Sequence, residues 1–155
     1  MAKSTFSGPV VSNNGFMQLG ANNVIDITAE TTLTVDAHAG RIIEVNDADG
    51  VITLPTIKSS EIGAKYTFLI QTNMTGKIKT DGTDKYVGTI MVAVDDGAKK
   101  SFVPGATNDV IDMNNGTQGG KVGSYIEITA LATAEYMVQG VLIGSGSVAT
   151  PFADA

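Results

Sequence analysis

Apolar and polar residues alternate with a period of two along many short stretches of this chain. Around Asp26, for example, Ile25 and Ile27 lie on one face and the aspartate lies on the other. A period of two is typical of a β-strand with one buried face, because successive side chains of a strand point to opposite sides. The same pattern predicts further strands at residues 33–35, 43–45, 66–70 and 89–94.

The clearest alternation lies near the C-terminus, in two stretches separated by a short connection. YIEITAL spans residues 125–131, EYMVQGVLI spans residues 135–143, and only residues 132–134 join them. Strands with so short a link have to run antiparallel. The sequence therefore predicts a C-terminal β-hairpin.

Glycine punctuates the predicted strands. Asn-Gly or Asp-Gly pairs supply the positive φ angles that tight hairpin turns require, and they occur at 14–15, 49–50, 81–82, 96–97 and 115–116. The only helical turn that the pattern favours is at 58–63, where Ser59 or Ser60 could cap it and Gly63 could end it. No exact internal repeat is present. Short strands with turn residues between them predict an all-β fold, an antiparallel β-sandwich or a jelly-roll-like barrel.

The two ends of the chain differ from its middle. Residues 1–23 contain isolated apolar residues without a period, and residues 144–155 are mostly small and polar. A chain of 155 residues is long enough for one core. We therefore expect an extended N-terminal arm at 1–23, a β-sandwich domain at 24–143 and a C-terminal tail at 144–155. Loosely packed ends and ends that dock on another chain are both compatible with this composition.

Charge and composition exclude several kinds of binding partner and site for this protein. The formal net charge is -6, and Lys99 and Lys100 form the only adjacent basic pair, so we expect no nucleic-acid partner. The absence of cysteine excludes disulfides, thiolate zinc sites and cysteine nucleophiles. No apolar run near the N-terminus is long enough for a signal peptide or a membrane span. We expect no membrane partner and synthesis in a cytoplasm.

The stretch EVNDADGVITLP, residues 44–55, is the strongest candidate for a metal site. If Gly50 is placed at the invariant glycine of a calcium loop, Asp47 and Asp49 fall at ligand positions. Val45 and Thr56 then occupy the first and last ligand positions, where carboxylates are needed. A type I′ hairpin corner is the better interpretation, with weak cation binding at Asp47 or Asp49 left open.

The remaining candidates for chemistry are better explained as turns. Asp residues tend to bond their own backbone in turns, and the close pairs are Asp81 with Asp84, Asp95 with Asp96, and Asp109 with Asp112. His38 is the only histidine, and no serine lies in a G-x-S-x-G elbow. GTQGGKVG, residues 116–123, lacks the order of a phosphate loop. We therefore expect no catalytic residue, no metal, no cofactor and no enzymatic activity.

Three segments resemble parts of known bacteriophage virion proteins. KSTFSGPVVSNNGF at 3–16 resembles N-terminal segments of small phage head proteins. GRIIEVNDADGVITLP at 40–55, followed by IGAKYTFLI at 62–70, resembles a β module that recurs in phage virion proteins. The closing hairpin, with Tyr136 after its turn, is similar to the last strands of that module, where an aromatic residue occupies this place.

The resemblance implies a capsid decoration, or cement, protein. Such a protein is a β-sandwich or jelly-roll-like domain, commonly a homotrimer, that binds the major capsid protein on the outside of an icosahedral shell and stabilises it. The expected location is the virion surface, after assembly in the host cytoplasm. Because extended segments can dock apolar anchors on a partner, we expect the N-terminal arm to bind the capsid or a neighbouring protomer through Phe6, Pro9, Phe16 and Met17.

Two alternatives remain open at this point. The same module occurs in head-fibre and tail-associated proteins. A carbohydrate- or receptor-binding β-sandwich could use the loops at 81–88 and 105–120, although the chain has no Trp and 6% aromatic residues.

Overall fold

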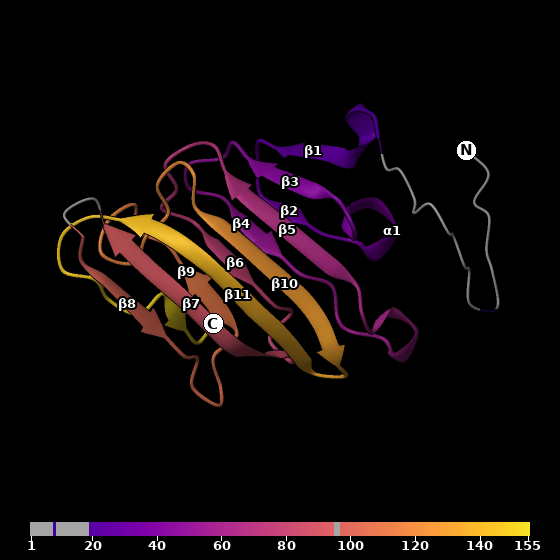
Figure 1. The fold of residues 1–155 in the computed structure, drawn as a ribbon. Helices are drawn as coiled ribbons and strands as arrows, with labels where there is room; N and C mark the ends of the chain where they lie inside the picture. The colour runs from indigo at the N-terminus through magenta and orange to yellow at the C-terminus, as the bar shows by residue number, and fades with distance from the viewer. Residues whose placement is uncertain (1–7, 9–18, 95–96) are drawn as a thin grey trace.

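The computed structural model describes residues 8, 19–94 and 97–155, and these residues form two β-sheets (Figure 1). The strands in chain order are β1 (Val24–Ile27), β2 (Thr31–Thr32), β3 (Ile42–Val45), β4 (Val51–Thr53), β5 (Lys65–Ile70), β6 (Lys77–Lys79), β7 (Lys85–Val94), β8 (Lys99–Phe102), β9 (Val110–Asp112), β10 (Tyr125–Ala132), β11 (Glu135–Gly144) and β12 (Phe152–Ala153). The helical turns are η1 (Ala21–Asn23), α1 (Val35–His38) and η2 (Ser59–Glu61). The expectation of a mostly β fold is confirmed.

The sheets are mixed, so the expectation of purely antiparallel sheets is wrong. Strand order is β1-β3-β5-β10-β11-β7-β8 in the seven-stranded sheet and β12-β9-β6-β4-β2 in the five-stranded sheet. The first six strands alternate between the two sheets, and neighbours within this group are parallel. The chain therefore winds through both sheets as a coil of three turns. Alternation in the sequence predicts strands but carries no information on which strands pair.

Later strands add antiparallel pairs to this coil. β10 pairs with β5 on one side and with β11 on the other, both antiparallel. The predicted C-terminal hairpin is thus confirmed, with Thr133 and Ala134 in its turn and Ala134 at φ 67°. A second hairpin joins β7 to β8 at Gly97, whose φ is 87°. β11 and β7 run parallel over ten residue pairs.

One hydrophobic core lies between the sheets. Ile43 and Phe68 of the seven-stranded sheet and Ile52 and Ile78 of the five-stranded sheet are all completely buried and belong to one cluster. In Figure 1 the five-stranded sheet lies behind the seven-stranded one. The alternating apolar positions of both sheets therefore face each other, as the period-two pattern requires.

Two buried tyrosines bond from one sheet to the other. Tyr136 of β11 donates its hydroxyl to Pro55 O at 2.6 Å, just beyond β4. Tyr86 of β7 donates to Ile78 O of β6 at 3.3 Å. Burial raises the pKa of both hydroxyls, so both stay protonated donors. Each tyrosine hydroxyl therefore has a hydrogen-bond acceptor inside the core.

Two local predictions need correction. The strand predicted at 33–35 is absent, because Thr34 Oγ1 accepts a bond from Ala37 N and caps α1. The helical turn predicted at 58–63 is confirmed as η2, but Lys58 is its N-cap and neither serine caps it. Gly63 follows at φ 92°, as a helix end favours.

The C-terminal segment of the chain contains a strand of the five-stranded sheet. The segment expected to form a C-terminal tail holds β12, where Phe152 pairs with Ile111 at the edge of the five-stranded sheet. Phe152 is buried, and its ring centroid lies 6.5 Å from that of Tyr86. The end of the chain is therefore part of the fold. Most of the predicted N-terminal arm, residues 1–7 and 9–18, lies outside the described residues.

The Ile78→Ala substitution tests the shared core. Ile78 is completely buried in the middle of the five-stranded sheet, so its truncation should lower the free energy of unfolding by about 2–5 kcal/mol. Chemical denaturation measures the loss. The matched control is Ile62→Ala, at a side chain that is 49% exposed, which should change stability by less than about 0.5 kcal/mol. Equal effects of the two substitutions would contradict the assigned core.

Candidate interaction surface

The outer face of the seven-stranded sheet carries a row of aligned side chains. The register places four apolar residues side by side on adjacent strands: Leu69, Tyr125, Val141 and Met91. We call these four the apolar row. Their strand neighbours, such as Phe68 and Ile126, are completely buried on the inner face. Tyr125 is 41% exposed and Val141 is 37% exposed, so the row presents apolar surface to solvent.

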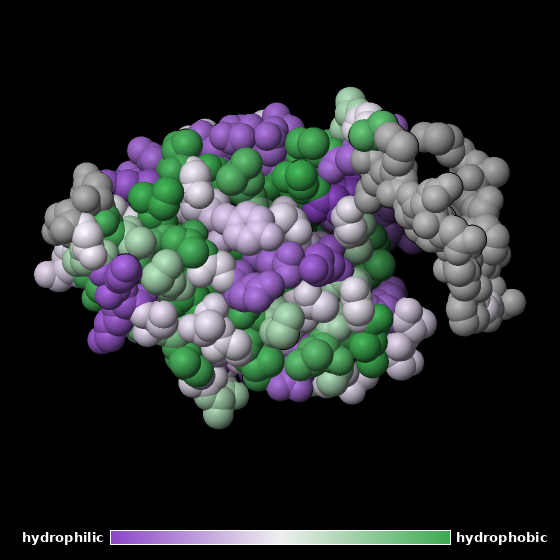
Figure 2. All heavy atoms as spheres, in the orientation of Figure 1, coloured by the Kyte–Doolittle hydropathy of each residue, from purple (hydrophilic) through white to green (hydrophobic). Residues whose placement is uncertain are grey.

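A polar cluster lies beside the apolar row and is held by hydrogen bonds. Glu127 of β10 accepts bonds from Lys65 Nζ at 3.0 Å, Gln139 Nε2 at 2.8 Å and Tyr125 Oη at 3.2 Å. The Lys65 bond, followed by the Gln139 bond, lowers the pKa of Glu127. Figure 2 shows a hydrophilic band across the middle of this face. The face thus combines apolar contact area with fixed polar groups, the composition of a typical protein interface.

The strands that flank the apolar row carry opposite charge. At the β1 and β3 end, Asp26 accepts from Asn46 Nδ2 at 2.7 Å and Glu44 accepts from Gln71 Nε2 at 3.0 Å. At the other end, the edge strand β8 exposes Lys99 and Lys100. Lysine on an edge strand opposes uncontrolled pairing with another sheet. The β8 edge is therefore protected against pairing with another sheet.

The partner-binding residues predicted from the sequence are not among those that define this surface. Phe6, Pro9, Phe16 and Met17 all lie outside the described residues, so their role stays a prediction. The apolar row was not predicted from the sequence. The available signal was apolar residues at the outward positions of alternating strands, as in Tyr125 and Val141, where a solvated face would have polar residues.

The candidate calcium loop forms a crossing between the two sheets, and the hairpin interpretation is wrong. It joins β3 of the seven-stranded sheet to β4 of the five-stranded sheet. Asp49 N donates to Asp47 Oδ1 at 3.4 Å. A Cβ at position 50 would lie 1.8 Å from Asp47 Oδ2, so a larger residue there would require the Asp47 side chain to move. Within the described part of the chain, no three His, Cys, Asp or Glu side chains could hold a metal together.

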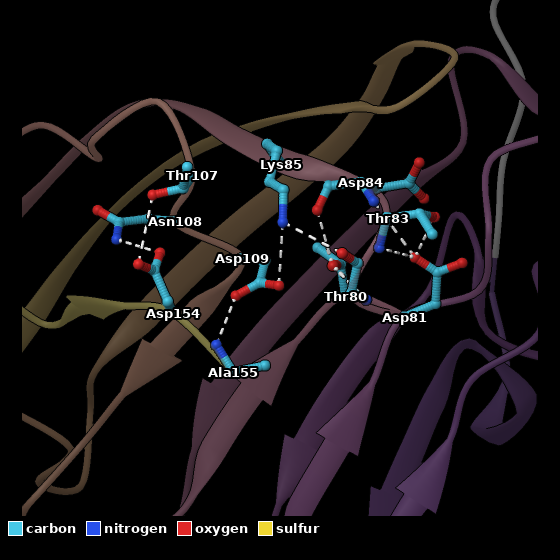
Figure 3. Close-up of polar contacts among 11 residues, drawn as sticks. Thr80, Asp81, Thr83, Asp84, Lys85, Thr107, Asn108, Asp109, Asp154 and Ala155 are labelled. Carbon is cyan, nitrogen blue, oxygen red and sulfur yellow. Dashed lines mark hydrogen bonds and ion pairs between the residues drawn. The ribbon is translucent and has the colours of Figure 1, made fainter.

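Asp81 organises the turn before β7 (Figure 3). Its Oδ1 accepts bonds from Thr83 N at 2.9 Å, Thr83 Oγ1 at 2.7 Å and Asp84 N at 3.3 Å, and its Oδ2 accepts from Thr56 Oγ1. Partial burial acts to raise the pKa of Asp81, but these bonds outweigh it and lower the pKa from 3.8 to about 2. The turn interpretation of Asp81 is confirmed.

Asp84 and Asp109 are buried, so the interpretation of all these aspartates as solvated loop residues is wrong for them. Asp84 is 1% exposed and accepts from Ile57 N at 3.1 Å, and burial raises its pKa. Asp109 is 4% exposed and binds Lys85 Nζ at 3.2 Å and Ala155 N at 2.9 Å. The carboxylates thus fasten neighbouring chain segments (Figure 3) and do not converge on a shared reaction site.

His38 has a local structural contact in α1. Its Nδ1 accepts a hydrogen bond from Thr34 N at 3.0 Å, so the imidazole is the acceptor for the backbone N–H of the residue that caps α1.

The glycine-rich stretch at 116–123 has a structural role in the backbone. Gly120 has a φ of 101°, and a Cβ there would lie 2.4 Å from Met74 O.

Comparison with known proteins finds no match for this chain among family models, curated proteins or solved structures. No helix in the described residues is long and apolar enough to cross a membrane.

The pKa of Asp81 predicts how one part of the stability depends on pH. Its folded pKa lies below 3.8, so the charged carboxylate stabilises the fold above about pH 4 and loses that contribution as the pH falls towards 2. Wild type should be more stable than Asp81→Asn at pH 6, and the gap should shrink as the pH falls from 4 to 2. Urea denaturation at a series of pH values measures this gap.

Asp84 acts in the opposite direction, and the negative charge of Asp81 contributes to its raised pKa, so Asp81→Asn also relieves part of that opposing effect. Thr83→Val should reproduce part of the loss of stability at pH 6, because it removes one hydrogen-bond donor to Asp81. The control is Thr107→Val, whose hydroxyl bonds Asp154 instead. A gap between wild type and Asp81→Asn that is constant from pH 6 to pH 2 would show that these bonds do not hold the carboxylate.

Proposed function

We propose that the protein is a structural component of a bacteriophage virion that binds the outer surface of the capsid and stabilises it as a decoration protein. The observation that carries the proposal is the outer face of the seven-stranded sheet, where the apolar row lies beside hydrogen-bonded polar groups. The proposed partner is the major capsid protein, and the proposed location is the virion surface.

The details of the fold and assembly belong to the same proposal. Two sheets around a shared core support classifying the domain as a β-sandwich of mixed sheets. A homotrimer would place several copies of a weak docking surface on one shell, so that the second and third contacts form at high effective concentration. The polar cluster of Lys65, Glu127 and Gln139 would orient each contact.

A carbohydrate- or receptor-binding module is the alternative, together with a head-fibre or tail-associated role. Sugar sites need exposed aromatic rings that stack on the pyranose face. Of the four tyrosines, Tyr66, Tyr86 and Tyr136 are buried in the core, whereas Tyr125 is exposed in the apolar row. The described residues therefore favour a protein partner over a glycan.

The Val141→Lys substitution tests the docking face. A lysine in the middle of the apolar row should weaken binding to empty capsids of the phage that encodes the protein by at least about tenfold, because its charge would be desolvated there. Co-sedimentation over a range of protein concentrations measures the affinity. Ile62→Lys is the matched control, since Ile62 is an exposed apolar residue outside the row. Unchanged binding by Val141→Lys would exclude this face.

Deletion of residues 2–16 tests the N-terminal anchors. Loss of Phe6, Pro9 and Phe16 should reduce co-sedimentation with empty capsids if the arm binds the shell. If the arm binds a neighbouring protomer instead, analytical ultracentrifugation should show a fall from three times the 16.0 kDa chain mass to a smaller species. A truncated protein that remains trimeric and binds capsids fully would refute the arm's role.

A further inference from the structure

The pairing between β7 and β8 is interrupted beside the edge of the sheet. The regular ladder reaches Ile90 and Phe102. Two residues further in the same register, Gly88 would face Pro104, which has no N–H to donate. A proline at this position ends the ladder, so residues 103–107 arch away from β7. Figure 1 shows this loop between β8 and β9 projecting from the body.

The chain returns to β7 at a single backbone bond. Tyr86 N donates to Asn108 O at 3.0 Å, while Thr89 Oγ1 donates to Phe102 O at 3.1 Å on the other side of the gap. Val94 N bonds Ala98 O on the same side. Since backbone groups alternate along a strand, even-numbered residues of β7 turn their N–H and C=O towards β8. Gly88 is exposed, has a φ of 114° and lies between two anchored positions. By this alternation we infer that its N–H and C=O face the gap.

A cavity of about 410 Å³ occupies this gap. This volume lies within the range of about 300–1,000 Å³ that is usual for ligand pockets. Three segments line it: residues 85–88 of β7, residues 103–106 of the arched loop, and residues 133–135 of the turn into β11. Gly88, Gly105, Ala106 and Ala134 leave space at the wall because their side chains are small or absent.

The wall offers three kinds of contact. Gly88 presents backbone donor and acceptor groups. Val103, which is 73% exposed, presents an aliphatic surface at the rim. Glu135 presents a carboxylate that accepts no hydrogen bond and forms no ion pair with any described residue. Lys85 also lines the cavity, but its ammonium binds Asp109 Oδ2 at 3.2 Å and Gly82 O at 3.1 Å (Figure 3). The uncompensated charge of the cavity is therefore negative.

We propose that this cavity binds an extended peptide segment with a small aliphatic residue followed by Lys or Arg. A main-chain amide of the segment pairs with Gly88 where β8 has left the sheet, in the manner of strand addition. The aliphatic side chain lies against Val103, and the cationic side chain pairs with Glu135. The proposal rests on the proposed function only in choosing a protein as the partner.

The lining disfavours a carbohydrate in this cavity, even though it includes parts of the loops at 81–88 and 105–120. Tyr86 is its only aromatic residue, and that ring is 2% exposed with its hydroxyl bonded inside the core. No ring face is available for stacking on a sugar. The open backbone of Gly88 instead matches the amide group that every peptide provides.

Nuclear magnetic resonance of the full ¹⁵N-labelled chain tests the proposal, with the probes N-acetyl-Val-Lys-amide and N-acetyl-Val-Glu-amide at millimolar concentrations. The Lys probe should shift the amide signals of Gly88, Val103, Gly105 and Ala134. The Glu probe should bind about two- to fivefold more weakly, the range that an exposed ion pair contributes. No shift at Gly88 and Gly105 with either probe would overturn the proposal.

Variants separate the contacts. Glu135→Gln should remove the difference between the two probes, whereas Glu30→Gln, at an exposed site outside the cavity, should keep it. Val103→Ser should weaken both probes, and Val122→Ser, at an exposed valine outside the lining, should weaken neither. Retention of the probe difference in Glu135→Gln would overturn the assigned role of the carboxylate.

A panel of mono- and disaccharides at the same concentrations forms the last arm of the test. Shifts of the cavity amides by a sugar but not by the peptides would assign the cavity to a carbohydrate and overturn the proposal. Failure of the peptide test can be told from failure of the proposed function, because capsid co-sedimentation reports the latter and does not depend on the probes.

Discussion

The packing of the two sheets on one shared apolar layer is the constraint on which the rest of the structure depends. Each sheet supplies the buried face that the other lacks, and burial of this apolar area is the main favourable term in folding. The hydroxyls of Tyr86 and Tyr136 add a directional element, because each has to reach a particular carbonyl across the core. An unsatisfied buried hydroxyl would be costly, so these bonds favour one relative placement of the sheets.

This constraint also determines how the acidic residues are used. Asp84 and Asp109 lie at the margin of the core, where they accept bonds from Ile57 N and from Lys85 and Ala155. Each carboxylate is occupied in holding two segments that are far apart in the sequence. Side chains that do not join distant chain segments lie on the outer face and at the rim of the cavity, among them Val141 and Glu135.

The longest strands, β5, β7, β10 and β11, could be predicted from the sequence, but most of the pairings between strands could not. Alternation of apolar residues located the strands that contain Asp26 and Phe68, and the short link at 132–134 was enough to specify the C-terminal hairpin because no other pairing can be reached. Near Asp47 the same local signals were compatible with a hairpin and with a crossing between sheets. The choice depends on contacts between distant residues, such as Val45 with Ile70, which a local pattern does not encode.

The candidate surface was harder still to predict. Outward-facing residues of different strands can be placed side by side only when the register between those strands is known. Tyr125 aligns with Leu69 and Val141 through two separate pairings. Likewise, Pro104 marks the end of the β7–β8 pairing only once the register of these strands is known. His38 and Asp84 show the converse limit, since their residue types permit catalysis and only their local bonds identify them as structural.

The three-turn coil has a consequence for how proteins of this design can vary. Each turn contributes one strand to each sheet, and its strands pair with the matching strands of the turn beside it, as in solenoid proteins, where stability is a sum over neighbouring units. Gain or loss of a turn next to β1 and β2 would change the height of the molecule while leaving the hairpins at its opposite side in place. Such a scaffold can lengthen in evolution without rebuilding the hairpins.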